Sequence, residues 1–167
     1  MKRFVKWVLR VALLLVVIAA VFLALMTYLE YKPAEKEVLH TNSKVEPYSL
    51  DTLRLLTWNI GYAGLDSNMD FFMDGGKRMR QTEEKTNENL EAIISFLSDY
   101  QNVDFCLLQD VDIKSRRSYQ IDELSAIALA MQQHLAFFAL HHQAELVPVP
   151  ISNPMEVVES GIAVFSR

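Results

Sequence analysis

The sequence predicts a mixed α/β domain that is attached to a membrane by one N-terminal transmembrane helix. Three observations lead to this prediction. A long uncharged apolar run lies near the N-terminus, strand-like and helix-like hydrophobic periods alternate after residue 52, and polar side chains follow two of the expected strands. Alternating strands and helices are typical of a sheet that is covered by helices.

The apolar run begins at Val11 and ends at Leu29, and it contains no charged residue, proline or glycine. As a helix it is about 28 Å long, close to the ~30 Å of a bilayer's hydrocarbon layer. Four basic residues precede the run, whereas the charges after it are mixed. The positive-inside rule therefore predicts that residues 1–10 form a cytoplasmic basic segment and that the remainder is extracytoplasmic.

Two alternatives compete with a retained signal anchor. A buried core helix rarely shows such a run on all its faces. A cleaved signal peptide usually has a shorter apolar region that ends at small residues, whereas this run is followed by bulky ones. We expect a single-pass membrane protein.

Charge and cysteine content limit the classes of function. Residues 38–167 carry ten Lys or Arg against eighteen Asp or Glu, so that 10 − 18 gives a formal net charge of −8. Such a domain is a poor candidate for a broad surface that follows nucleic-acid phosphates, although a compact phosphate site is compatible with it. The single cysteine, Cys106, excludes an intrachain disulfide, and no obligate protein partner is evident.

Residues 30–52 are polar, contain two prolines and are predicted to be a linker. The domain then spans residues 53–167. Hydrophobic periods predict strands at 53–60, 103–109, 137–142 and 161–166, and amphipathic helices at 82–100 and 121–135. A loop with three prolines, residues 147–155, separates the last two strands.

Polar residues follow the first two strands. Asn59 ends the first strand, Asp110 ends the second, and Asp112 lies two residues further on. Ligand-binding groups in open α/β sheets lie at the carboxyl ends of strands, and amide and carboxylate oxygens suit a hard cation or a phosphate site. Taken alone, an Asn before a glycine is also typical of a turn, and an Asp after a strand is typical of a helix cap or a solvated loop.

Three segments, LTWNIG (56–61), LLQDVD (107–112) and ESGIAVFSR (159–167), resemble in order and spacing the first half of the endonuclease/exonuclease/phosphatase superfamily, which includes deoxyribonuclease I. The resemblance implies that Asn59 orients the phosphate and the active-site groups and that Asp110 binds the catalytic Mg²⁺ or Mn²⁺. It also implies that residues 53–167 are the N-terminal half of a four-layer α/β/β/α sandwich.

The sequence departs from the family in two respects. The family usually has Glu where Asp110 stands, and the missing methylene shortens the reach by about 1–1.5 Å. Either the backbone closes that gap, a water intervenes or metal affinity falls, and Asp112 is an alternative ligand. The second-half motifs, including a terminal Asp-His pair, do not occur. We therefore expect this chain to be an inactive fragment whose last strand leaves an open sheet edge.

Arg116 and Arg117 follow Asp110 closely and are predicted to bind a substrate phosphate, the alternative being a solvated loop pair. The predicted function is a membrane-anchored, metal-dependent phosphoesterase of the nuclease, phosphatase or sphingomyelinase type. Its substrate would be a lipid head group, a soluble phosphate ester or a nucleic acid. The alternative is a membrane-tethered pseudoenzyme or binding module.

Overall fold

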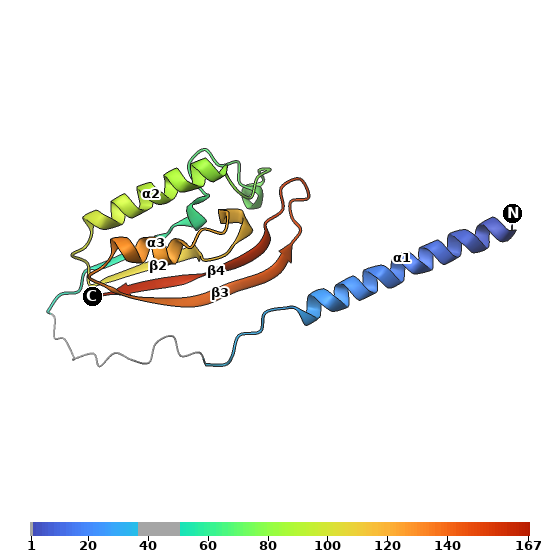
Figure 1. Ribbon diagram of the computed structural model, residues 1–167, viewed down its shortest axis with the longest axis horizontal. Coiled ribbons are helices and arrows are strands. Elements are labelled where there is room, and N and C mark those ends of the chain that lie inside the picture. The colour runs from blue at the N-terminus through green and yellow to red at the C-terminus, as the bar shows by residue number, and fades with distance from the viewer. Residues whose placement is uncertain (1, 37–50) are drawn as a thin grey trace. The chain divides into compact units, whose positions relative to one another are not determined.

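The computed structural model describes residues 2–36 and 51–167, and it consists of two compact units that are treated separately below. The first unit contains one helix, α1 (Lys2–Tyr28), and none of the residues of that helix is buried (Figure 1). With 27 residues and an 18-residue window whose mean hydropathy is 3.0, it is long and apolar enough to cross a membrane. The helix also includes most of the basic segment predicted for residues 1–10, and residues 37–50 of the predicted linker lie outside the described residues.

The second unit is built on a mixed four-stranded sheet. Its strands are β1 (Leu55–Asn59), β2 (Phe105–Asp112), β3 (Leu135–Val147) and β4 (Glu156–Ser166), in the order β1-β2-β4-β3. β1 and β2 are parallel, and β4 runs antiparallel to both of its neighbours. The sequence order of strands and helices is confirmed. The prediction that the last strand leaves an open sheet edge is wrong. β4 pairs on both sides, and the edges of the sheet are β1 and β3.

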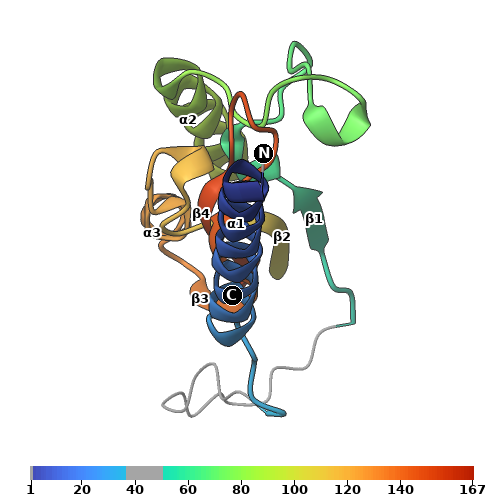
Figure 2. The same cartoon turned by 90° about the vertical axis from the view of Figure 1, so that its right-hand side faces the viewer.

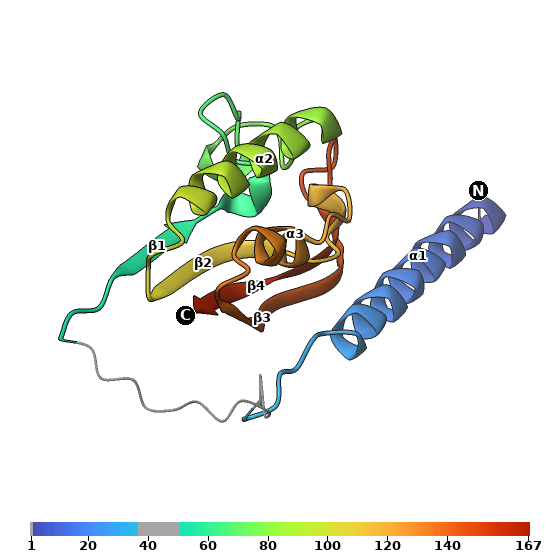
Figure 3. The ribbon, with the colours of Figure 1, turned by 60° about the vertical axis from the view of Figure 1, so that its left-hand side comes forward.

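Two helices, α2 (Glu83–Asp99) and α3 (Glu123–Ala130), cover the same face of the sheet (Figures 1 and 3). The hydroxyl of Thr82 caps α2 by accepting a hydrogen bond from the Lys85 amide at 3.3 Å. The core between helices and sheet is apolar and includes Leu90, Leu97, Cys106, Leu108, Ile127 and Phe165.

α3 is shorter than the predicted helix 121–135. It ends at Ala130, and the chain turns between residues 131 and 134 before β3 begins at Leu135. The buried His134 ring lies 2.8 Å from the Val103 carbonyl oxygen and so anchors this turn. The apolar spacing up to Leu135 resembles a helix, but this tertiary contact ends the helix earlier.

The opposite face of the sheet carries no covering element among residues 51–167 (Figures 1 and 2). The strand register places Leu55, Phe105, Ser166 and Leu135 side by side across this face. Leu55 is 64% exposed, Leu135 is 50% exposed and Ile162 is 38% exposed. An exposed apolar sheet face of this kind is typical of a surface that packs against another layer.

Candidate functional site

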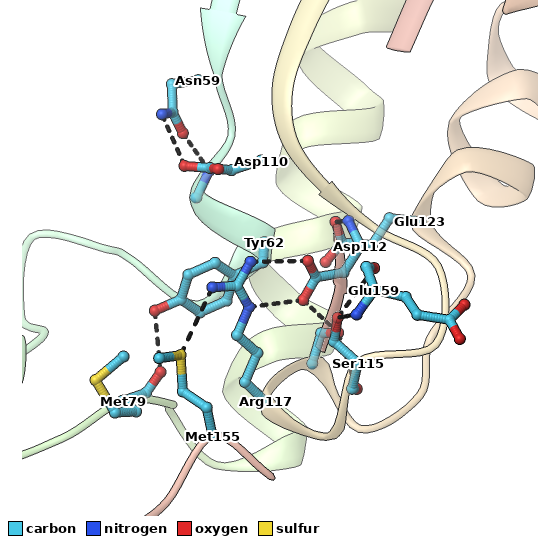
Figure 4. Close-up of polar contacts among 12 residues, drawn as sticks. Asn59, Tyr62, Met79, Asp110, Asp112, Ser115, Arg117, Glu123, Met155 and Glu159 are labelled. Carbon is cyan, nitrogen blue, oxygen red and sulfur yellow. Dashed lines mark hydrogen bonds and ion pairs between the residues drawn. The ribbon is translucent and has the colours of Figure 1, made fainter. Parts of the chain in front are cut away.

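Asn59 and Asp110 lie together at the carboxyl ends of the neighbouring parallel strands β1 and β2. The Nδ2 of Asn59 donates a hydrogen bond of 2.8 Å to Oδ2 of Asp110 (Figure 4). The Oδ1 of Asn59 accepts a hydrogen bond of 2.9 Å from the Gly61 amide. Asn59 therefore stabilises the turn after β1 and also contacts Asp110. Its role in orienting a phosphate stays a prediction.

A β-bulge sets the position of Asp110. Pairing of β2 with β4 is regular up to Leu108 opposite Ala163 and resumes at Val111 opposite Gly161. Between these pairs Asp110 has φ +54°, in the left-handed region that is strained by about 1–3 kcal/mol for a residue other than glycine. Bulges of this kind re-aim a side chain. Here the carboxylate of Asp110 meets Asn59 on the adjacent strand.

Asp112 does not lie with this pair but is completely buried. Both of its carboxylate oxygens accept hydrogen bonds of 2.9 Å from Arg117, one from Nε and one from Nη2. Oδ2 accepts a third, of 3.0 Å, from the Ser118 hydroxyl. The alternative metal ligand of the sequence analysis therefore has both oxygens occupied inside the protein.

The guanidinium group of Arg117 contacts three side chains, those of Asp112, Tyr62 and Met155. Its side chain is only 11% exposed, and the group lies 3.8 Å from the centroid of the Tyr62 ring. Its Nη1 also contacts the Met155 sulfur at 3.8 Å (Figure 4). Burial lowers the pKa of Arg117, but the hydrogen bonds and the charge of Asp112 raise it by more. The structure brings the guanidinium group of Arg117 to Asp112, and binding of a substrate phosphate by Arg117 stays a prediction.

Glu123 completes the buried group of charges. Its Oε2 accepts a hydrogen bond of 2.8 Å from the backbone amide of Asp112, and among the described residues its Oε1 has no partner. Burial, and then the charge of Asp112, raise the pKa of Glu123 well above its usual value, so that the protonated acid is favoured. Neither Glu123 nor Tyr62 is predicted from the sequence as a site residue. The only local signal for Glu123 was its place in the first turn of α3, directly after the capping residue Asp122.

Arg116, the other predicted phosphate ligand, lies nearer to the solvent. Its side chain is 51% exposed and forms an ion pair of 2.8 Å with Glu156. The backbone carbonyl of Arg116 accepts a hydrogen bond of 3.2 Å from Nη1 of Arg80. Arg116 and Arg117 are neighbours in one short 3-10 helix (Arg116–Ser118), yet they occupy opposite environments.

A cavity of about 510 Å³ lies beside Asn59, between β1 and α2. Trp58 and Phe96 form part of its wall and contact each other edge to face, with ring centroids 5.1 Å apart. Asp66 and Asn89 supply polar atoms at the same cavity. Asn59 therefore lies where two parallel strands end and where a partly apolar cavity begins.

The carboxylate of Asp110 supplies oxygen of the kind that a hard divalent cation binds, whereas Oδ1 of Asn59 already accepts the hydrogen bond from the Gly61 amide. The described residues contain no group of three His, Cys, Asp or Glu side chains that could form a closed metal cage. Mg²⁺ does not need such a cage, because it commonly takes one or two carboxylates together with water and substrate phosphate oxygens. Asp110 would hold such an ion, and Asn59 would orient the carboxylate.

Comparison of the chain with protein-family models, with curated proteins and with solved structures gave no match.

Proposed function

We propose that this protein is a membrane-anchored phosphoesterase that depends on Mg²⁺ or Mn²⁺. The observation that carries the proposal is the 2.8 Å hydrogen bond between Asn59 and Asp110 at the carboxyl ends of two adjacent parallel strands. The resemblance of three sequence segments to the endonuclease/exonuclease/phosphatase superfamily supports it, since their Asn and acidic residues coincide with this pair.

The chemistry follows from the donor atoms of the two residues. A bound divalent ion supplies positive charge that polarises a phosphoryl oxygen and favours attack by water. Asp110 would hold the ion through its carboxylate. Asn59 has two amide hydrogens, and Asp110 takes one of them. The other can be donated to a phosphate oxygen, which would fix the orientation of the ester.

The proposed architecture is one half of a four-layer sandwich. The uncovered sheet face exposes Leu55, Leu135 and Ile162, and a second sheet packed about 10 Å away would bury these side chains. We further propose that the N-terminus is cytoplasmic and the domain extracytoplasmic. The substrates would then be lipid head groups, exported phosphate esters or extracellular nucleic acid.

The first prediction concerns metal binding by Asp110. Asp110→Asn in the full chain, held in detergent micelles, should weaken Mn²⁺ binding at least about tenfold, because the substitution removes the charged ligand. Electron paramagnetic resonance titration of free Mn²⁺ measures the affinity. Asp74→Asn is the matched control, since it removes the same charge from an exposed position in another segment.

A second measurement tests whether the bound metal ion lies close to a phosphate group. Mn²⁺ held by Asp110 should broaden the ³¹P signal of inorganic phosphate in the wild type and in Asp74→Asn, but not in Asp110→Asn. Equal Mn²⁺ affinity in all three proteins would contradict the proposal. That result would favour a membrane-tethered binding module or pseudoenzyme.

A further inference from the structure

The guanidinium group of Arg117 contacts one residue that follows Asp110 and one residue that follows Asn59. Asp112, which Arg117 binds through two hydrogen bonds of 2.9 Å, lies two residues after Asp110. Tyr62, whose ring lies 3.8 Å from the same group, lies three residues after Asn59. Arg117 therefore links the segments that leave the site on both strands.

The hydrogen bonds between Arg117 and Asp112 fix the segment of β2 that follows the bulge at Asp110. Asp110 has a strained backbone, and a strained conformation persists only where the surrounding structure determines it. The amide of Asp112 donates to Glu123 at 2.8 Å, and its carboxylate is bound by Arg117 and Ser118. Asp112, Ser118 and Glu123 are all fully buried, so that this end of the bulge has little freedom to move.

The link to Tyr62 secures the turn that follows Asn59. Tyr62 also has a left-handed backbone, with φ +43°, and its hydroxyl donates a hydrogen bond of 2.9 Å to the Met79 carbonyl. The residue before it, Gly61, donates the backbone hydrogen bond that fixes Oδ1 of Asn59. A shift of the Tyr62 ring would therefore move the turn on which the orientation of Asn59 depends.

We propose that Arg117 is a positioning residue, which holds both segments so that Asn59 and Asp110 stay hydrogen-bonded to each other. The role of this pair in metal binding rests on the proposed function, whereas the effect of Arg117 on its geometry does not. A planar group with donors on several edges can bind Asp112 and stack on Tyr62 at the same time, which a lysine cannot do.

The test compares Arg117→Lys with Arg116→Lys in the full chain in micelles. Both substitutions keep the positive charge in the same 3-10 helix, but only Arg117 contacts Asp112 and Tyr62. The ¹H–¹⁵N signals of the Asn59 side-chain amide report directly on its hydrogen bond, and they are identified by their absence in Asn59→Asp. In Arg117→Lys they should move towards their positions in Asp110→Asn, and Mn²⁺ affinity should fall about tenfold.

Arg116→Lys should leave both measurements at wild-type values. Unchanged Asn59 signals in a folded Arg117→Lys protein would overturn the inference. If that variant does not fold, Asp112→Asn takes its place, since it removes the charge that Arg117 binds and one of the two carboxylate oxygens that accept from it. Unmoved Asn59 amide signals in Asp112→Asn would likewise overturn the inference.

The two proposals fail in different ways. If the wild type and Asp110→Asn bind Mn²⁺ equally, the proposed function fails. A shifted Asn59 amide in Arg117→Lys would still support the positioning role in that case.

Discussion

Two carboxyl groups and one guanidinium group share the buried region behind the candidate site. Asp112 and Glu123 are fully buried, and Arg117 is the only cation in contact with Asp112 among the described residues. Two ionised carboxylates facing one guanidinium group would leave an uncompensated buried charge, which is costly. Protonation of Glu123 removes that charge, in accordance with its raised pKa.

The stability of the domain should therefore depend on the protonation of Glu123. Because its pKa is higher in the folded state, the folded protein retains a proton that the unfolded chain has lost. The stabilisation is fully present below the ordinary pKa of 4.5 and is lost as the pH rises towards the folded-state value, by at most about 1.4 kcal/mol per pH unit. Glu123→Gln, a neutral group of the same shape, should abolish this loss.

Urea unfolding at pH 5 and at pH 8 measures the effect. Glu83→Gln provides the control, since Glu83 is an exposed acid in the first turn of the other helix. The idea fails if the free energy of unfolding of Glu123→Gln falls between the two pH values as much as that of the wild type.

At the level of elements, β2 joins the core to the site. Its first half follows the two-residue period, with Cys106 and Leu108 facing the helices. The bulge then interrupts the period, so that Asp110 turns towards Asn59. Opposite the bulge, a Cβ on Gly161 would lie 2.3 Å from the Ala139 carbonyl oxygen, so no other residue fits there without displacement of the backbone.

Two substitutions on α3 can test which face of this helix packs against the core. Ile127 is fully buried against the core, whereas Leu129 on the same helix is 73% exposed. Ile127→Ala should lower the free energy of unfolding by about 2–5 kcal/mol, because it leaves a cavity. Leu129→Ala should change it by less than about 0.5 kcal/mol.

Fluorescence of Trp58 during urea unfolding, in a Trp7→Phe background, measures both values. Similar losses of stability in the two variants would show that α3 packs through a different face.

On the scale of the whole molecule, the chain combines an apolar helix with an acidic folded domain. None of the apolar side chains of the helix is buried, which is stable in lipid and unfavourable in water. The proposed orientation places the four basic residues before position 11 in the cytoplasm.

Single cysteines can test this orientation. The native Cys106 should not react with maleimides, because it is fully buried and burial raises its pKa to about 11. In intact cells that express the protein, a membrane-impermeant maleimide should label Ser67→Cys, whose position is an exposed loop, but label Lys2→Cys only after lysis.

The wild type serves as the unlabelled control in both conditions. Labelling of Lys2→Cys in intact cells would reverse the proposed topology. A shortened chain that lacks residue 2 would instead identify a cleaved signal peptide.

The sequence by itself determined the apolar helix, the order of strands and helices and the placement of Asn59 and Asp110 at the carboxyl ends of two strands. These features depend on local composition, on the hydrophobic period and on the rule that open α/β sheets present ligand-binding groups at the carboxyl ends of their strands. Only the tertiary structure decided that β4 lies inside the sheet, that α3 ends at Ala130 and that Arg117 binds Asp112 instead of lying in an open loop. Each of these depends on contacts between residues whose proximity is set by the packing of the whole domain, and such contacts leave no periodic signal in the sequence.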